Sequence, residues 1–190
     1  DTPLPRRKLP IGIQTFARLR EDGCYYVDKT PHILRLIDEG THYFLSRPRR
    51  FGKSLLIDTI AELFEGNAAL FTGLHAEQHW DWSQRCAVVR ISFTDGVLHS
   101  RAALDSRILV LLQENYARLG LALPESKAIT ELFGLLLRQL HARTGQRVVV
   151  LVDEYDKPIL DNIKDQSEAL RIRDVLKDLY SVIKDSDAHI

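Results

Sequence analysis

Five consecutive apolar residues, Val148 to Val152, constrain the fold of this chain more than any other feature of its sequence. An unbroken run rich in β-branched side chains is typical of a strand buried on both faces of a parallel sheet. Other strand-like segments alternate with helical patterns along the chain, which predicts βαβ units. We therefore expect an α/β fold, a three-layer sandwich with helices on both faces of a mostly parallel sheet.

The rest of the expected organisation follows from proline, glycine and apolar spacing. Residues 1–10 contain three prolines and three cations and predict an extended arm, with a single domain over residues 11–190. Further strands are expected at Tyr25–Val27, His42–Ser46 and Cys86–Phe93. Helices are expected over Pro31–Ile37, Leu55–Phe64, Leu104–Leu119, Ile129–Leu140 and Ile172–Ile183, the last with Asp165 and Glu168 as a capping box, and Pro158 is expected to begin a short helix. Residues 67–85 are expected to be irregular, with Trp80 and Trp82 as packing anchors.

A loop between an expected strand and an expected helix carries the first chemical motif. The phosphate-binding pattern G-x-x-x-x-G-K-[ST] ends here in Gly52, Lys53 and Ser54, while Arg47 replaces its first glycine. Such a loop binds phosphates through backbone N–H groups and the helix dipole. The lysine places its positive charge beside the β- and γ-phosphates, and the serine hydroxyl binds Mg²⁺. The residues predicted to bind ATP are Arg49, Arg50, Phe51, Gly52, Lys53, Ser54 and Leu55.

An acidic pair directly follows the Val148–Val152 run. Asp153 and Glu154 stand where a Walker B element has its acids, at the carboxyl end of a buried strand, where ligands of open α/β sheets bind. We expect Asp153 to hold Mg²⁺ together with Ser54, and Glu154 to act as the catalytic residue that orients the attacking water. The alternative is that the pair merely ends a strand and caps the next helix.

These motifs also resemble those of a known family. The segments Tyr43–Leu56 and Val152–Ile159, with the opening Pro10–Thr30, are similar to the AAA-ATPase-like family of bacterial and archaeal proteins. The resemblance implies an ASCE-type P-loop ATPase in which arginine commonly replaces the first loop glycine, and in which Ile11–Ile13 line the adenine pocket. It also implies a PD-(D/E)XK nuclease-like domain after the ATPase domain. Members continue with a further strand and a sensor residue, so we expect this sequence to be truncated before its last strands and weakly active by itself.

Composition limits the setting in which the chain works. The formal net charge is zero, so bulk electrostatics neither favour nor exclude nucleic acid. Two distant cysteines, Cys24 and Cys86, lack the spacing of a metal site and predict reduced thiols. No apolar run is long enough for a membrane span and no signal peptide is visible, so we expect a cytoplasmic protein without a membrane partner.

Two other functions stay open at this level. One is a degenerate module that binds nucleotide or nucleic acid without turnover, which Arg47 favours. The other is a DNA-dependent ATPase that serves a nuclease, since Arg47, Arg49, Arg50 and Lys53 suit nucleic-acid phosphates as well as a triphosphate. A homo-oligomer is also compatible with the sequence. His75 and His79 are four residues apart, but the lack of an H-E-x-x-H pattern argues against a metal site.

Overall fold

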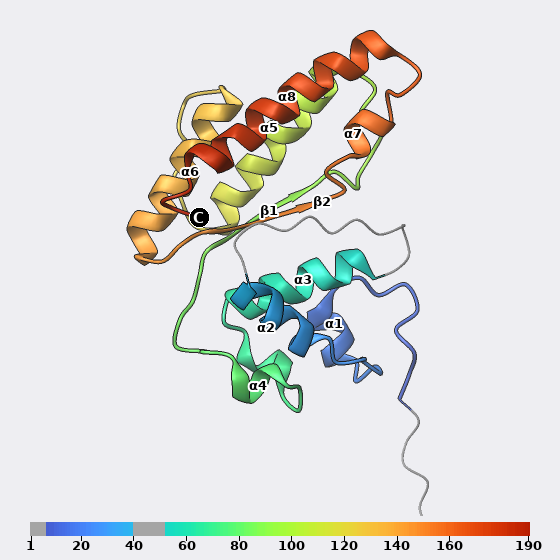
Figure 1. Ribbon diagram of the computed structural model, residues 1–190, viewed down its shortest axis with the longest axis vertical. Helices are drawn as coiled ribbons and strands as arrows, with labels where there is room; N and C mark the ends of the chain where they lie inside the picture. The colour runs from blue at the N-terminus through green and yellow to red at the C-terminus, as the bar shows by residue number, and fades with distance from the viewer. Residues whose placement is uncertain (1–6, 40–51) are drawn as a thin grey trace, which may run out of the picture. The chain divides into compact units, whose positions relative to one another are not determined.

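The computed structural model describes residues 7–39 and 52–190 of the chain, which divides into two compact units, Asp1–Arg85 and Cys86–Ile190 (Figure 1). The two are described separately below. The single domain predicted over residues 11–190 stays a prediction, as does the arm over residues 1–10. The strand predicted at His42–Ser46 lies outside the described residues.

The first unit is helical over its described residues. Its elements are α1 (Phe16–Glu21), α2 (Thr30–Glu39), α3 (Lys53–Phe64), the 3₁₀ turn η1 (Ala68–Phe71) and α4 (Ala76–His79). Phe16, Leu63 and Phe71 are fully buried at its centre. Trp80 and Trp82 pack against this cluster as the sequence predicted, and the ring of Trp82 lies 5.2 Å from that of Phe71.

The strand predicted at Tyr25–Val27 is wrong. The segment has no strand structure, and one backbone bond, from Tyr25 N–H to the Lys8 carbonyl at 2.9 Å, accompanies it. Tyr25 and Val27 are exposed and Tyr26 is half-buried, so this segment runs over the surface of the helical core. Alternating burial along a short segment shows which side chains face the core, but it does not show that a partner strand exists.

Residues 67–85, predicted to be irregular, contain η1 and α4. Asp28 explains why α4 forms: its carboxylate accepts hydrogen bonds from His75 N–H at 2.7 Å and from Thr30 N–H at 2.9 Å. The Thr30 hydroxyl then accepts from Ala76 N–H at 3.1 Å. The groups that satisfy the His75 and Ala76 donors come from 46 to 47 residues earlier in the chain, a distance that local sequence patterns do not bridge.

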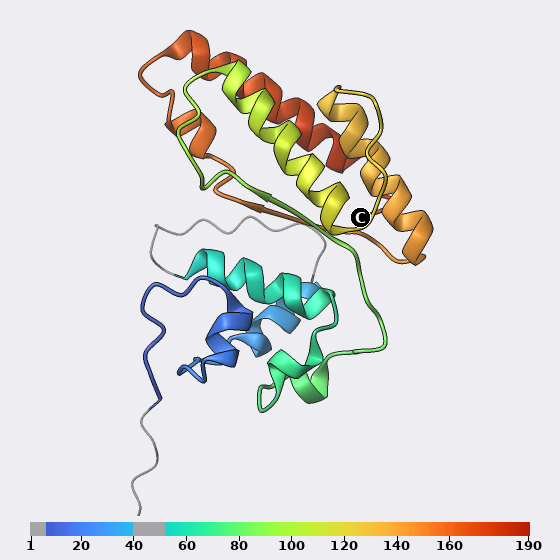
Figure 2. The same ribbon diagram turned by 180° about the vertical axis from the view of Figure 1, so that it is seen from behind.

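The second unit contains the sheet. Its elements are β1 (Val88–Ser92), α5 (Arg101–Arg118), α6 (Ile129–Thr144), β2 (Val149–Asp153), α7 (Lys157–Leu160) and α8 (Gln166–Asp185). The strands pair in parallel, with Val88 opposite Val149 and Ser92 opposite Asp153. Helices α5, α6 and α8 lie on one side of the pair in both views (Figures 1 and 2). This confirms a mixed α/β structure with a parallel sheet, whereas the three-layer sandwich stays a prediction.

The burial of β2 differs from the sequence expectation. Val150 and Val152 pack against the helical core, but Val149 to Val152 are each only half-buried. Strand β1 is more deeply buried, because Val89 and Ile91 face α5 and α6 within the same core. The unbroken apolar run therefore located the strand correctly but overstated how completely it is covered within this unit.

Strand β1 has its outer edge closed by side chains of α5. The buried Asn115 accepts a hydrogen bond from Arg90 N–H at 2.9 Å and donates to the Arg90 carbonyl at 2.8 Å. Arg118 donates to the Val88 carbonyl at 2.5 Å. The backbone groups of Val88 and Arg90 point away from β2, because the residues at the alternate positions, such as Ala87 and Phe93, are the ones that bond to β2. A strand whose edge is occupied in this way does not offer it to another strand.

Helix ends follow the predicted chemistry with one difference. The Asp165 carboxylate accepts from Glu168 N–H at 3.1 Å and caps α8, as predicted. The carboxylate of Glu168 accepts instead from Arg101 N–H, so it joins the start of α8 to the start of α5.

Among residues 7–39 and 52–190, none of the helices combines the length and apolar character that a membrane crossing requires.

Candidate functional site

The N-terminus of α3 is where the sequence predicts phosphate binding. The helix begins at Lys53, directly after Gly52, whose φ of 72° and ψ of 21° lie in the left-handed region that glycine tolerates without strain. Lys53 and Ser54 are half-buried in the first turn. The first N–H groups of a helix lack intrahelical acceptors and carry partial positive charge, so this end suits an anion. The predicted residues Arg47, Arg49, Arg50 and Phe51 lie outside the described residues.

Contacts farther along α3 fix this end of the helix. The Asp58 carboxylate accepts a hydrogen bond from Phe16 N–H at 2.6 Å, which ties the second turn of α3 to the start of α1. The Thr59 hydroxyl donates to the Leu55 carbonyl at 2.7 Å, and Leu63 is fully buried. Because α3 is held through its length, Lys53 and Ser54 stand on a rigid element rather than on a free turn.

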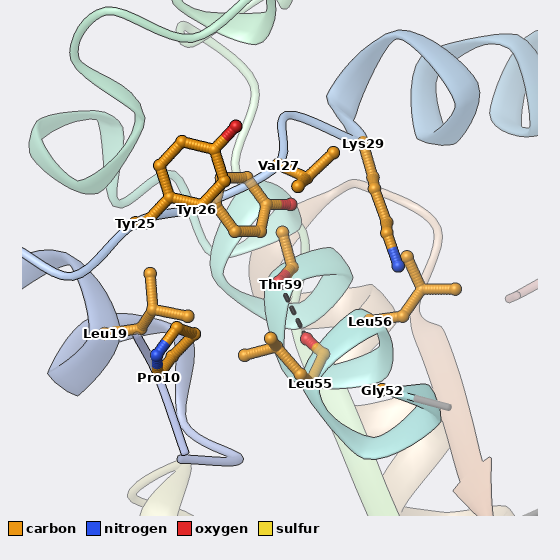
Figure 3. Close-up of a pocket in the computed structure, with 10 residues that line it drawn as sticks. All are labelled: Pro10, Leu19, Tyr25, Tyr26, Val27, Lys29, Gly52, Leu55, Leu56 and Thr59. Atoms are coloured by element: carbon orange, nitrogen blue, oxygen red, sulfur yellow. Dashed lines mark hydrogen bonds between the residues drawn. The ribbon is translucent and has the colours of Figure 1, made fainter. Parts of the chain in front are cut away.

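A pocket of about 280 Å³ opens beside Gly52 within the first unit (Figure 3). Its walls come from α1, from the α1–α2 connection, from the first two turns of α3 with Gly52 before them, and from Pro10. The residues that line it are Pro10, Leu19, Tyr25, Tyr26, Val27, Lys29, Gly52, Leu55, Leu56 and Thr59. Leu55, predicted as a nucleotide contact, is among them. Ile11 to Ile13, expected at an adenine pocket, are not, and Ile11 is 87% exposed.

The acidic pair lies at the carboxyl end of β2. Asp153 is the last residue of the strand and is 7% exposed, and its carbonyl accepts from Phe93 N–H at 3.1 Å. Glu154 follows with a φ of 56°. Within residues 7–39 and 52–190 it is the one non-glycine residue with positive φ. A non-glycine residue held there costs about 1–3 kcal/mol, and such strain collects at functional sites.

Two hydrogen bonds hold the turn that contains Glu154. The Tyr180 hydroxyl of α8 donates to the Tyr155 carbonyl at 3.3 Å, and Lys157 N–H donates to the Glu154 carbonyl at 3.1 Å. Burial, followed by the negative charge of Asp156, raises the pKa of Tyr180 above its usual value, so its hydroxyl keeps the proton that it donates.

A buried lysine joins this turn to the loop that follows β1. The ammonium group of Lys157 donates to the Gly96 carbonyl at 2.5 Å and to the Asp161 carboxylate at 2.8 Å. Asp161 also accepts from Leu98 N–H at 3.3 Å, and Asn162 donates to the Leu98 carbonyl. Burial acts to raise the pKa of Asp161, but the hydrogen bonds from Lys157 and Leu98 outweigh it and the pKa is lowered. Of this network, the sequence shows only the i,i+4 spacing between Lys157 and Asp161.

The predicted site residues fall in both units. Gly52, Lys53, Ser54 and Leu55 belong to the first, whereas Asp153 and Glu154 belong to the second. Their joint action on one nucleotide and one Mg²⁺ therefore stays a prediction.

The rings of His75 and His79 stack at 3.8 Å, and in the described parts of the chain no three or more His, Cys, Asp or Glu residues form a metal-binding group.

Comparison with known proteins decides the family. A protein family described as "Predicted AAA-ATPase" matches residues 10–190. This chain belongs to the AAA-ATPase-like family. The resemblance drawn from the loop around Gly52 and from the acidic pair is thereby confirmed.

A relative from Azotobacter chroococcum mcd 1 extends the comparison. It is described as an uncharacterized protein in the vnfD 5′ region and is 59% identical over 188 residues. The match covers 98% of this chain and 36% of that protein, so this AAA-ATPase-like chain spans about a third of its relative. No solved structure matches. The family indicates ATP and nucleotide binding, while the nuclease-like domain predicted from the resemblance is not shown.

Proposed function

We propose that this chain binds ATP with Mg²⁺ and hydrolyses it. The observation that carries the proposal is the start of α3: a left-handed Gly52 followed by Lys53 and Ser54 in the first turn of a helix that Asp58 fixes to α1. Membership of an AAA-ATPase-like family supports the same ligand. Lys53 neutralises the β- and γ-phosphates, and the N–H groups at the start of α3 donate hydrogen bonds to the phosphate oxygens.

Ser54 of the first unit and Asp153 and Glu154 of the second supply the hydrolytic part of the proposal. Ser54 and Asp153 offer a hydroxyl and a carboxylate, the oxygen donors that Mg²⁺ prefers. When bound, that ion would neutralise charge on the phosphates. Glu154 orients the attacking water and accepts its proton, and its strained backbone supports this role, since the turn is held in a conformation that the residue would not adopt by itself. Arg49, Arg50 and Phe51 complete the phosphate loop.

The test separates binding from turnover with two substitutions. Lys53→Ala removes the charge that the phosphates require, so calorimetry with Mg-ATP should show its affinity reduced by at least tenfold. Glu154→Gln keeps the binding groups and removes the base, so affinity is retained while kcat falls by about 100-fold or more. Lys164→Ala, at an exposed lysine of the second unit, is the charge-matched control and should bind as the wild type does.

Four outcomes would contradict parts of the proposal. Equal ATP affinity in wild type and Lys53→Ala removes α3 as the phosphate site. An unchanged kcat in Glu154→Gln moves the base to another residue. ATP binding without turnover in the wild type favours the non-hydrolysing module, whereas turnover that appears only when DNA is added favours a DNA-dependent ATPase.

A further inference from the structure

The turn between β2 and α7 begins at Glu154 and is closed by a backbone hydrogen bond. Lys157 N–H donates to the Glu154 carbonyl at 3.1 Å. The φ of 56° at Glu154 shows that the backbone of this turn is strained. A hydrogen bond within the turn does not by itself maintain such strain, because strained residues persist only where the surrounding structure over-determines them. Contacts from outside the turn are therefore required.

The carbonyl of Tyr155, the residue after Glu154, is served by neither of the backbone donors that follow it in the chain. Pro158, three residues on, has no N–H to donate. The N–H of Ile159, four residues on, donates instead to the Asp156 carbonyl at 3.1 Å. The i→i+3 and i→i+4 bonds that would fix this carbonyl in a turn or a helix are thus directed elsewhere.

Helix α8 supplies a donor for this carbonyl. The Tyr180 hydroxyl donates to the Tyr155 carbonyl at 3.3 Å, and α8 lies beside α7 in both views (Figures 1 and 2). Tyr180 is half-buried and packs against the core of the second unit, and Leu176 and Leu179 of the same helix are buried in that core. The phenol ring is therefore held by a packed helix, and its hydroxyl fixes the residue that follows Glu154.

We propose that Tyr180 is a positioning residue for ATP hydrolysis, which holds the Glu154 turn so that the Glu154 carboxylate meets the attacking water. The inference rests on the proposed function, because it takes Glu154 as the residue that orients this water. A general base must lie within about 2.6–3.2 Å of its partner atom, so a small rotation of its backbone carries it out of reach. The phosphates are bound at the start of α3 instead, so Tyr180 acts on kcat and not on ATP affinity.

The experiment compares two tyrosines of the second unit whose hydroxyls each donate to a backbone carbonyl. The matched control is Tyr116 of α5, which donates to the Leu132 carbonyl of α6 at 2.8 Å. Tyr180→Phe and Tyr116→Phe each remove one such bond and keep the ring, so both should lower the midpoint of urea unfolding. Only Tyr180→Phe should also lower kcat, by about tenfold, with ATP affinity unchanged.

Two further measurements separate positioning from general support of the fold. In the Glu154→Gln background, Tyr180→Phe should lower the residual kcat by no more than about twofold, because the group that it positions is already lost. Hydrogen exchange of the amides of residues 154–157 measures the stability of the turn without turnover. It should be about tenfold faster in Tyr180→Phe than in wild type, and unchanged in Tyr116→Phe.

The outcomes distinguish this inference from the function on which it rests. If the wild type hydrolyses ATP and Tyr180→Phe keeps the same kcat, the positioning role is refuted while the proposed function stands. The role is also refuted if Tyr116→Phe loses as much activity, if amide exchange of the turn is unchanged in Tyr180→Phe, or if the tenfold loss persists beside Glu154→Gln. If the wild type does not hydrolyse ATP, the proposed function fails and the role of Tyr180 fails with it.

Discussion

At the scale of single residues, tertiary contacts set the backbone conformation of Glu154 and the burial of Lys157 in the second unit. Glu154 was predicted, from its place after a strand, as the catalytic residue that orients the attacking water, but nothing in its neighbours indicated its left-handed backbone, since that position usually selects glycine. Lys157 lies next to Pro158, the expected start of a short helix, but its burial against Gly96 depends on a loop 61 residues away. Side-chain identity is local information, whereas strain and burial are set by tertiary contacts.

The strain at Glu154 predicts an inverted order of two substitutions. Glu154→Gly should be more stable than Glu154→Ala by about 1 kcal/mol, because the left-handed region costs an L-residue about 1–2 kcal/mol. At Lys177, an exposed position within α8, the order should be the ordinary one, with alanine more stable than glycine by about 1 kcal/mol. Urea unfolding measures both pairs. The same order at both positions would show that Glu154 carries no backbone strain.

The ion pair of Lys157 and Asp161 predicts a pH dependence. The pKa of Asp161 is lowered on folding, so the pair contributes stability above the unfolded carboxyl pKa of about 3.9 and loses it as pH falls through the lower folded value. Asp161→Asn should cost about 1.5–3 kcal/mol at pH 7, the range for a hydrogen bond to a charged group. The cost should shrink below pH 4. A difference from wild type that is equal at pH 7 and pH 3 would contradict the pairing.

At the scale of elements, helices followed from the sequence because their periodicity is local. The predicted helical segments over Leu55–Phe64, Leu104–Leu119 and Ile129–Leu140 lie within or almost within α3, α5 and α6. Strands were harder. The run that predicted β2 is confirmed to within one residue, but Tyr25–Val27 is not a strand, since pairing depends on a distant partner that a short alternation cannot reveal.

The closed edge of β1 is an element-scale feature with a measurable cost. Asn115→Leu keeps a side chain of similar size but removes both hydrogen bonds to Arg90, leaving backbone groups of β1 without these partners. At about 1–3 kcal/mol for each buried group, the free energy of unfolding should fall by about 2–4 kcal/mol. Gln113→Leu, exposed on the same helix, should change it by no more than about 0.5 kcal/mol. Equal effects of the two substitutions would show that Asn115 does not support β1.

At the scale of the whole molecule, sequence order predicted that two motifs serve one reaction. The structure finds each motif at the end of an element suited to it, Lys53 at the start of α3 and Asp153 at the end of β2. They belong to separate compact units, each with its own core. Local patterns predict how each unit presents its residues, but whether the two sets meet around one nucleotide is a property of the assembled chain.

A double-mutant cycle tests this joint action directly. If Ser54 and Asp153 hold the same Mg²⁺, then Ser54→Ala and Asp153→Asn each weaken Mg-ATP binding, and the double variant loses less than the sum of the two effects, because the second substitution removes a ligand from a site already impaired. We expect a coupling of at least about 1 kcal/mol in Mg-ATP binding, and less with ATP in the presence of a chelator. Ser54→Ala combined with Lys164→Ala should be additive within about 0.5 kcal/mol, since Lys164 has no part in the proposal. Equal additivity for Ser54 and Asp153 would mean that the two motifs do not share an ion, and that Asp153 serves the fold of the second unit rather than the nucleotide.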